Sequence, residues 1–102
     1  DLLEINPDEI IVLYHKLRIL NKLDRFFESN MICKRLLNIY PNNGYILYDM
    51  ASNFLKMGDD KNFLLTLKKA VNEISNLKNK SKNNREFEHF HNNATFMKIV
   101  FE

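Results

Sequence analysis

Two apolar segments that end in proline lie one repeat length apart in this chain, LLEINPDE near the start and LLNIYPNN in the middle. Pro7 and Pro41 are separated by 34 residues, and the same shift superimposes further residues. The matched pairs are Leu2 with Leu36, Leu3 with Leu37, Ile5 with Ile39, Leu13 with Leu47, Tyr14 with Tyr48 and Lys22 with Lys56. A period of this length is typical of stacked helix-turn-helix units. The sequence therefore predicts an all-α fold of antiparallel helix pairs.

The composition supports helices over strands. The chain has 102 residues, 45% of them apolar, which suits a single domain. It holds only two glycines and two prolines, whereas an all-β domain needs turn residues every 8 to 12 positions. The net charge of +2 comes from acidic and basic groups mixed along the chain, so it neither favours nor excludes a polyanionic partner. The sequence has no run of 18 apolar residues, so we expect no membrane segment.

Apolar residues at three- and four-residue spacing predict a first pair of helices. The first helix starts near Asp8, where acidic residues suit the positive end of the helix dipole, and it ends around Asp24. The second helix ends at Pro41, because the proline ring cannot supply a helical N–H.

A second pair follows. The third helix is expected from about Gly44 to Gly58, with Asn42 and Asn43 as candidate N-caps. Gly58 suits the left-handed conformation of a C-cap. Asp59 and Asp60 then supply N-cap chemistry for the fourth helix, whose apolar residues include Phe63, Leu67, Ala70 and Ile74.

The last quarter of the chain departs from the 34-residue pattern. Residues 78–84 are rich in Lys, Asn and Ser and carry no large apolar residue, so we expect a mobile link or a frayed helix end there. Beyond it, apolar residues indicate two short helices divided by an Asn92-Asn93 cap. These apolar residues are Phe87, Phe90, Phe96, Ile99 and Val100. Such a tail would cover the hydrophobic face of the last repeat.

The spacing resembles that of the tetratricopeptide repeat family. Residues 44–77 match its pattern at Leu47, Met50, Ala51, Phe54, the Met57-Gly58-Asp59 turn, Leu67 and Ala70. Phe63 stands where the family has a small residue, and Ser75 replaces its closing proline. Residues 10–43 keep Leu13, Leu20, Ser29, Cys33 and Pro41, but Lys16 and Leu17 replace the usual Leu-Gly pair. We expect a looser or differently angled first pair for that reason.

The resemblance implies a right-handed solenoid in four parts. Residues 1–9 would be the end of a preceding repeat, 10–43 and 44–77 would be repeats, and 78–102 would be a link with capping helices. The phenylalanine-rich tail is similar to the ends of bacterial arrays. Such arrays act as non-catalytic scaffolds or adaptors that bind a protein or peptide on their concave face. The concave residues would be Ile11, Tyr14, His15, Arg18, Asn21 and Lys22 from one repeat and Tyr45, Tyr48, Asp49, Ser52 and Lys56 from the next.

Two interpretations stay open for these concave residues. Tyr14 and Tyr48 would either contact a peptide or pack against neighbouring helices with only their edges showing. Arg18, Lys22 and Lys56 would either meet a carboxylate or be solvated side chains on a helix face. The Lys/Asn constellation with which some members of the family bind chaperone tails is absent.

The sequence gives weak support to catalysis, a metal or a cofactor. The three histidines are His15, His89 and His91. His89 and His91 point to different faces of a helix, and no set of Cys, Asp or Glu residues accompanies them at ligand spacing. Cys33, the single cysteine, falls on the apolar side of its helix, where it acts as a small hydrophobe. We therefore expect no enzyme and no cofactor.

Two other functions compete with peptide binding. A basic cluster could contact nucleic acid, but it lacks interleaved aromatic residues, so a solvated link is favoured; its members are Lys78, Lys80, Lys82 and Arg85. An oligomerising or regulatory domain could pair with another copy through an N-terminal edge of Leu2, Leu3 and Ile5. A cytoplasmic and a periplasmic location both fit, with the cytoplasmic one slightly favoured.

Overall fold

The computed structural model describes residues 7–102, and over that range it is all-helical, as the sequence predicts. The elements are α1 Pro7–Lys22, α2 Phe26–Ile39, α3 Gly44–Lys56, α4 Asp60–Glu73, α5 Leu77–Lys82, the 3-10 helix η2 Arg85–Phe90 and α6 Ala94–Phe101. Of the expected end of a preceding repeat, Pro7, Asp8 and Glu9 form the first turn of α1. The expected edge of Leu2, Leu3 and Ile5 lies outside the described residues.

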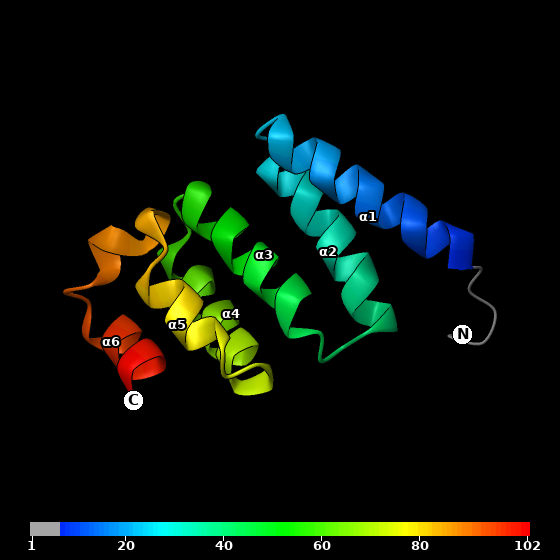
Figure 1. Cartoon of the computed structure of the whole chain (residues 1–102). Helices are drawn as coiled ribbons and strands as arrows, with labels where there is room; N and C mark the ends of the chain where they lie inside the picture. The colour runs from blue at the N-terminus through cyan, green and yellow to red at the C-terminus, as the bar shows by residue number, and fades with distance from the viewer. Residues whose placement is uncertain (1–6) are drawn as a thin grey trace.

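The helices form two antiparallel pairs and a tail. α1 packs against α2, α2 against α3, and α3 against α4, while α5 and α6 pack on α4 and on each other. Figure 1 shows α1, α3 and α5 running in the same direction, with α2 and α4 opposed to them. The molecule measures 44 × 27 × 20 Å with a radius of gyration of 14.0 Å. A compact domain of this length has about 13 Å, so this chain is slightly extended.

Short polar side chains fix the helix starts that the sequence marks. Asn43 Oδ1 accepts hydrogen bonds from the backbone N–H of Tyr45 and of Ile46, both at 3.1 Å, and so caps α3. Asp59 caps α4 through the N–H of Asn62 at 3.2 Å. Two candidates stood before each helix. The cap of α3 is Asn43 and not Asn42, and the cap of α4 is Asp59 and not Asp60. Asn93, again the second of its pair, caps α6.

A residue in the left-handed backbone conformation follows the first helix of each pair, α1 and α3. Gly58 has φ 79°, as expected for a C-cap glycine. Asp24 has φ 58° in the turn between α1 and α2, a conformation that few residues other than glycine, asparagine and aspartate adopt readily. The predicted ends at Asp24 and Gly58 are thus each two residues past the last helical residue, in the turn that reverses the chain.

The core has two parts. In the first, Leu13 and Leu17 of α1 and Cys33 and Leu36 of α2 enclose the apolar face of α3 at Ile46 and Met50. In the second, α3 and α4 pack against the tail. Because α3 contributes to both, it joins the two helix pairs into one packed unit.

A buried polar network also links the pairs, and sequence reasoning missed it. The amide of Asn53 in α3 donates to Ser29 Oγ at 2.9 Å and to Asn30 Oδ1 at 3.0 Å in α2. Ser29 Oγ in turn donates to Asn21 Oδ1 in α1 at 2.5 Å. Asn30 Nδ2 is buried with no hydrogen-bond partner among the described residues. Because burying an amide without a partner is costly, these bonds favour one relative position of α1, α2 and α3.

The tail contains more helix than the sequence predicts. Where the sequence predicts a mobile link or a frayed helix end at residues 78–84, most of this segment is instead the helix α5, Leu77–Lys82, packed on α4 and α6. Leu77 and Ser81, one turn apart, are buried, and Ser81 Oγ donates to the carbonyl of Leu77 at 2.7 Å. The short helices expected after it are present as η2 and α6, and they start at residues 85 and 94.

Phenylalanines of the tail surround one residue of α4. The ring centroid of Phe63 lies 4.9 Å from that of Phe87, 4.8 Å from Phe90 and 6.4 Å from Phe96. Phe63, Phe87 and Phe96 are fully buried. Aromatic pairs at these distances add to the stability that burial gives. Phe63, which stands where the resemblance asks for a small residue, is therefore the centre of the contact with the tail.

Candidate functional site

The sequence-predicted site residues lie on one face of α1 and α3, which we call the inner face. On α1, His15, Arg18 and Lys22 are exposed and Tyr14 is half-buried. On α3, Asp49 and Lys56 are exposed and Ser52 is half-buried, and Tyr45 is 62% exposed. The spacing of Tyr45, Asp49, Ser52 and Lys56 is three or four residues, so their side chains form a stripe along α3.

Tyr48 is an exception. Of its two interpretations, contact with a peptide or packing against neighbouring helices, the structure shows packing. Its exposed fraction is 4%, and its ring packs against Phe87 with centroids 5.7 Å apart. Lys80 Nζ lies over the same ring at 4.9 Å, and Asn84 Nδ2 donates to the hydroxyl at 2.9 Å. Burial raises the pKa of Tyr48, and the hydrogen bond from Asn84 opposes that shift. Tyr48 therefore joins α3 to the tail, and Tyr45 is the more accessible tyrosine.

Asp49 is the centre of the inner face. Loss of hydration raises the pKa of its carboxyl group, while the ammonium groups of Lys80 and Lys56 oppose the shift. The side chain is nevertheless exposed to solvent, so the loss of hydration is partial and its cost is small.

Tyr14 connects this carboxylate to α1. Burial raises the pKa of its phenol first, followed by the charges of Tyr40 and Asp49. Tyr14 and Asp49 are therefore close enough to interact electrostatically, although they belong to different helix pairs. With Lys80, groups from α1, α3 and α5 meet on the same face.

Lys56 marks the end of the inner face next to the tail. Its Nζ lies 3.2 Å from Glu86 Oε2 and 5.1 Å from the ring centroid of Phe26. This lysine thus links α3, α2 and η2. Because the ion pair is partly exposed, it stabilises the fold by little and remains open to exchange with a partner's carboxylate.

Sequence reasoning missed the contribution of the tail to this face. Lys80 and Asn84 both contact Tyr48, and Glu86 contacts Lys56. One signal in the sequence could have indicated this contribution. Leu77 and Ser81 are four residues apart, as two residues on one side of a helix are, and such a helix would contain Lys80 and end just before Asn84.

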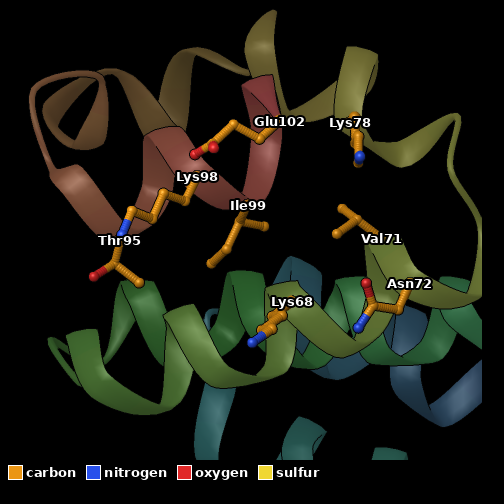
Figure 2. Close-up of a pocket in the computed structure, with 8 residues that line it drawn as sticks. All are labelled: Lys68, Val71, Asn72, Lys78, Thr95, Lys98, Ile99 and Glu102. Carbon is orange, nitrogen blue, oxygen red and sulfur yellow. The ribbon is translucent and has the colours of Figure 1, made fainter.

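A hollow of about 480 Å³ lies between α4, α5 and α6. Figure 2 shows Lys68 and Asn72 on α4 below, and Lys98, Ile99 and Glu102 of the last turns above. Its residues are Lys68, Val71, Asn72, Lys78, Thr95, Lys98, Ile99 and Glu102. Three ammonium groups around an apolar floor could attract an anion, but solvated lysines of this kind bind weakly by themselves.

The basic cluster of the tail does not form one patch. Lys80 lies over Tyr48, Lys82 lies 4.8 Å from the ring centroid of Phe101, and Lys78 lines the hollow of Figure 2. These three side chains therefore serve three different contacts. Their divergence removes the structural basis for treating them as a common phosphate-binding surface.

Two of the remaining candidates for chemistry, Cys33 and His91, pack against neighbouring side chains. Burial raises the pKa of the Cys33 thiol to about 12, so it stays protonated and weakly nucleophilic at neutral pH. The ring of His91 stacks on Phe96 with centroids 5.6 Å apart. Within residues 7–102, no three His, Cys, Asp or Glu residues are grouped so that they could hold a metal ion.

Comparisons with known protein families, with curated proteins and with solved structures found no match to this chain. None of the described helices has the length and apolarity needed to cross a membrane.

Proposed function

We propose that this chain is a tetratricopeptide-like scaffold that binds an acidic, extended segment of another protein on its inner face. The carrying observation is the position of Asp49, whose carboxylate interacts with Tyr14 of α1, Lys56 of α3 and Lys80 of α5. Three helices that run in the same direction thus contribute to one solvent-exposed surface. A surface of this kind is the contact surface in helical repeat proteins.

The repeat itself supports the proposal. Leu13 and Leu47 are 34 residues apart, lie in equivalent helices and are both buried. The second helix of the first pair packs against the first helix of the second pair, which is the contact that propagates an array. The tail covers α4, as a terminal cap would.

The charge of the inner face supports an acidic partner. Its cations are Arg18, Lys22, Lys56 and Lys80, and its carboxylates are Asp49 and Glu86. Arg18 and Lys22 are exposed on α1, one turn apart, where they can meet two carboxylates of an extended chain. Asp49 and the hydroxyl of Tyr45 would accept hydrogen bonds from the backbone N–H groups of that chain.

Selection from a phage-displayed library of random peptides tests this function. We expect the wild-type chain to enrich peptides rich in Asp and Glu. The double variant Arg18→Glu/Lys22→Glu should bind the enriched peptides at least about ten-fold more weakly, equivalent to about 1.4 kcal/mol.

The matched control is Lys34→Glu/Lys61→Glu, which changes the net charge equally at exposed positions of α2 and α4. This control should keep its affinity within about two-fold, a difference below 0.5 kcal/mol. A selection without acidic enrichment, or an equal loss in both double variants, would contradict the proposal.

A further inference from the structure

The side of the first helix pair that faces away from α3 is unusually apolar; we call it the outer edge. Its large side chains include Val12, Ile19 and Leu23 of α1, exposed by 50%, 56% and 60%, and Met31 of α2, exposed by 54%. Between the two helices lies a hollow of about 500 Å³. Clustered apolar side chains of this size are found at contact surfaces more often than at random.

The hollow has charged residues at both ends. Its lining residues are Lys16, Ile19, Leu20, Glu28, Met31, Ile32 and Arg35. Lys16 and Arg35 also line a neighbouring hollow with Val12, so these two cations lie near each other. Glu28 forms a 3.6 Å pair with Arg25 in which both side chains are more than half exposed. An exposed pair of this type is worth little and exchanges readily.

Glu28 and Arg35 are arranged so that each can meet the other across a two-fold axis. They are seven residues apart on α2, which is two turns and about 10 Å along the helix. Met31 and Ile32 lie midway between them. If α2 packs antiparallel on α2 of a second copy with the axis at this midpoint, Glu28 of each copy faces Arg35 of the other.

The apolar residues of α1 obey the same two-fold axis. When the axis passes between residues 17 and 18 of α1, Val12 of one copy faces Leu23 of the other. Residues 17–18 of α1 and 31–32 of α2 are about equally far, along their helices, from the turn at Asp24. One axis therefore satisfies the ion pairs of α2 and the apolar contacts of α1 together, and it places Ile19 close to the centre.

We propose that the outer edge is the interface of a homodimer in which the two copies pack antiparallel through α1 and α2. The interface is independent of the inner face. Two helices of 16 and 14 residues present a surface roughly 24 Å by 20 Å, or about 500 Å² per copy. Stable interfaces bury about 800 Å² per copy, so this dimer is weak and reversible.

Sedimentation velocity over a hundred-fold range of concentration, up to about 1 mM, tests the dimer. We expect wild type to shift from monomer to dimer within that range. Glu28→Arg and Arg35→Glu should each weaken dimerisation at least about five-fold, because each places like charges opposite one another. The double variant E28R/R35E restores both pairs across the axis and should dimerise as wild type does.

Lys34→Glu is the control, since Lys34 is exposed on α2 and lines neither hollow. It should leave dimerisation unchanged, and circular dichroism should show equal helix content in all variants. If E28R and the double variant lose helix content because the pair with Arg25 is gone, the comparison of Arg35→Glu with wild type and with Lys34→Glu still decides. A wild type that stays monomeric, or a double variant no better than Arg35→Glu, would overturn the proposal.

Discussion

At the scale of single residues, equivalent positions in the two pairs have different roles. Tyr14 and Tyr48 match under the 34-residue shift, yet Tyr14 is half-buried and Tyr48 is buried. The difference comes from what each ring meets. Phe87, Lys80 and Asn84 of the tail all contact Tyr48, whereas the groups near Tyr14 are those of the helix pairs. The repeat predicts the position of a side chain, but its neighbours decide its exposure.

We predict that Tyr48→Ala destabilises the fold instead of selectively weakening partner binding. Loss of the buried ring should cost about 3 kcal/mol, as truncation of a buried aromatic commonly does. Tyr48→Phe should cost only about 1 kcal/mol, because it removes the hydroxyl that accepts the hydrogen bond from Asn84. Urea denaturation of the two variants measures both values.

Tyr45→Ala is the matched control, because that side chain is 62% exposed on the same helix. Its free energy of unfolding should stay within about 0.5 kcal/mol of wild type. A Tyr48→Ala variant as stable as Tyr45→Ala would show that the contact between Tyr48 and the tail contributes nothing.

At the scale of helices, periodicity and caps predicted α1 to α4 closely. Their ends are marked by Pro41, Asn43, Gly58 and Asp59, whose backbone chemistry acts locally and so can be read from the sequence. α5 could not be recognised in the same way. It has six residues, and only Leu77 and Ser81 are buried, so no apolar stripe marks it. Its helix depends on packing against α4 and α6, which a local pattern does not encode.

The inner face was predicted in part for the same reason. The spacing of Tyr14, Arg18 and Lys22 follows from the helix period, and all three lie where that period places them on α1. The burial of Tyr48 and the contribution of Lys80 could not be predicted, because both depend on how the tail folds back. Phe63 shows the same limit: its size is explained only by the phenylalanines of η2 and α6 around it.

We predict that the tail is required for stability. Truncation after Asn84 removes Phe87, Phe90 and Phe96, each worth roughly 1.5–3 kcal/mol when buried, from a fold whose total stability is about 5–15 kcal/mol. The shortened chain should melt at a much lower temperature or aggregate, because the apolar face of α4 becomes exposed. Differential scanning calorimetry measures the shift.

Phe101→Ala in the full-length chain is the control for this truncation, since Phe101 is 48% exposed. It should lower the melting temperature by no more than a few degrees, equivalent to about 1 kcal/mol or less. A truncated chain with the melting temperature of the full-length one would mean that the tail is not docked on α4.

At the scale of the whole molecule, α1 takes part in two surfaces of different character, the inner face and the outer edge. The inner face carries Asp49 among cations, while the outer edge carries exposed large apolar residues with Glu28 and Arg35 in a self-complementary order. The buried network of Asn53, Ser29 and Asn30 holds α2 against α3. A dimer through the outer edge would leave both inner faces free, so one assembly could bind two acidic segments.

Chemical-shift mapping of the 15N-labelled chain with an acidic peptide from the library selection tests the central claim, that the inner face is the binding surface. The account predicts that the largest changes occur at Tyr14 and Arg18 of α1 and at Tyr45 and Asp49 of α3, and that the outer edge is unaffected at low protein concentration. Changes confined to the hollow around Lys68 and Lys98 would contradict it, because the peptide would then bind between α4 and α6.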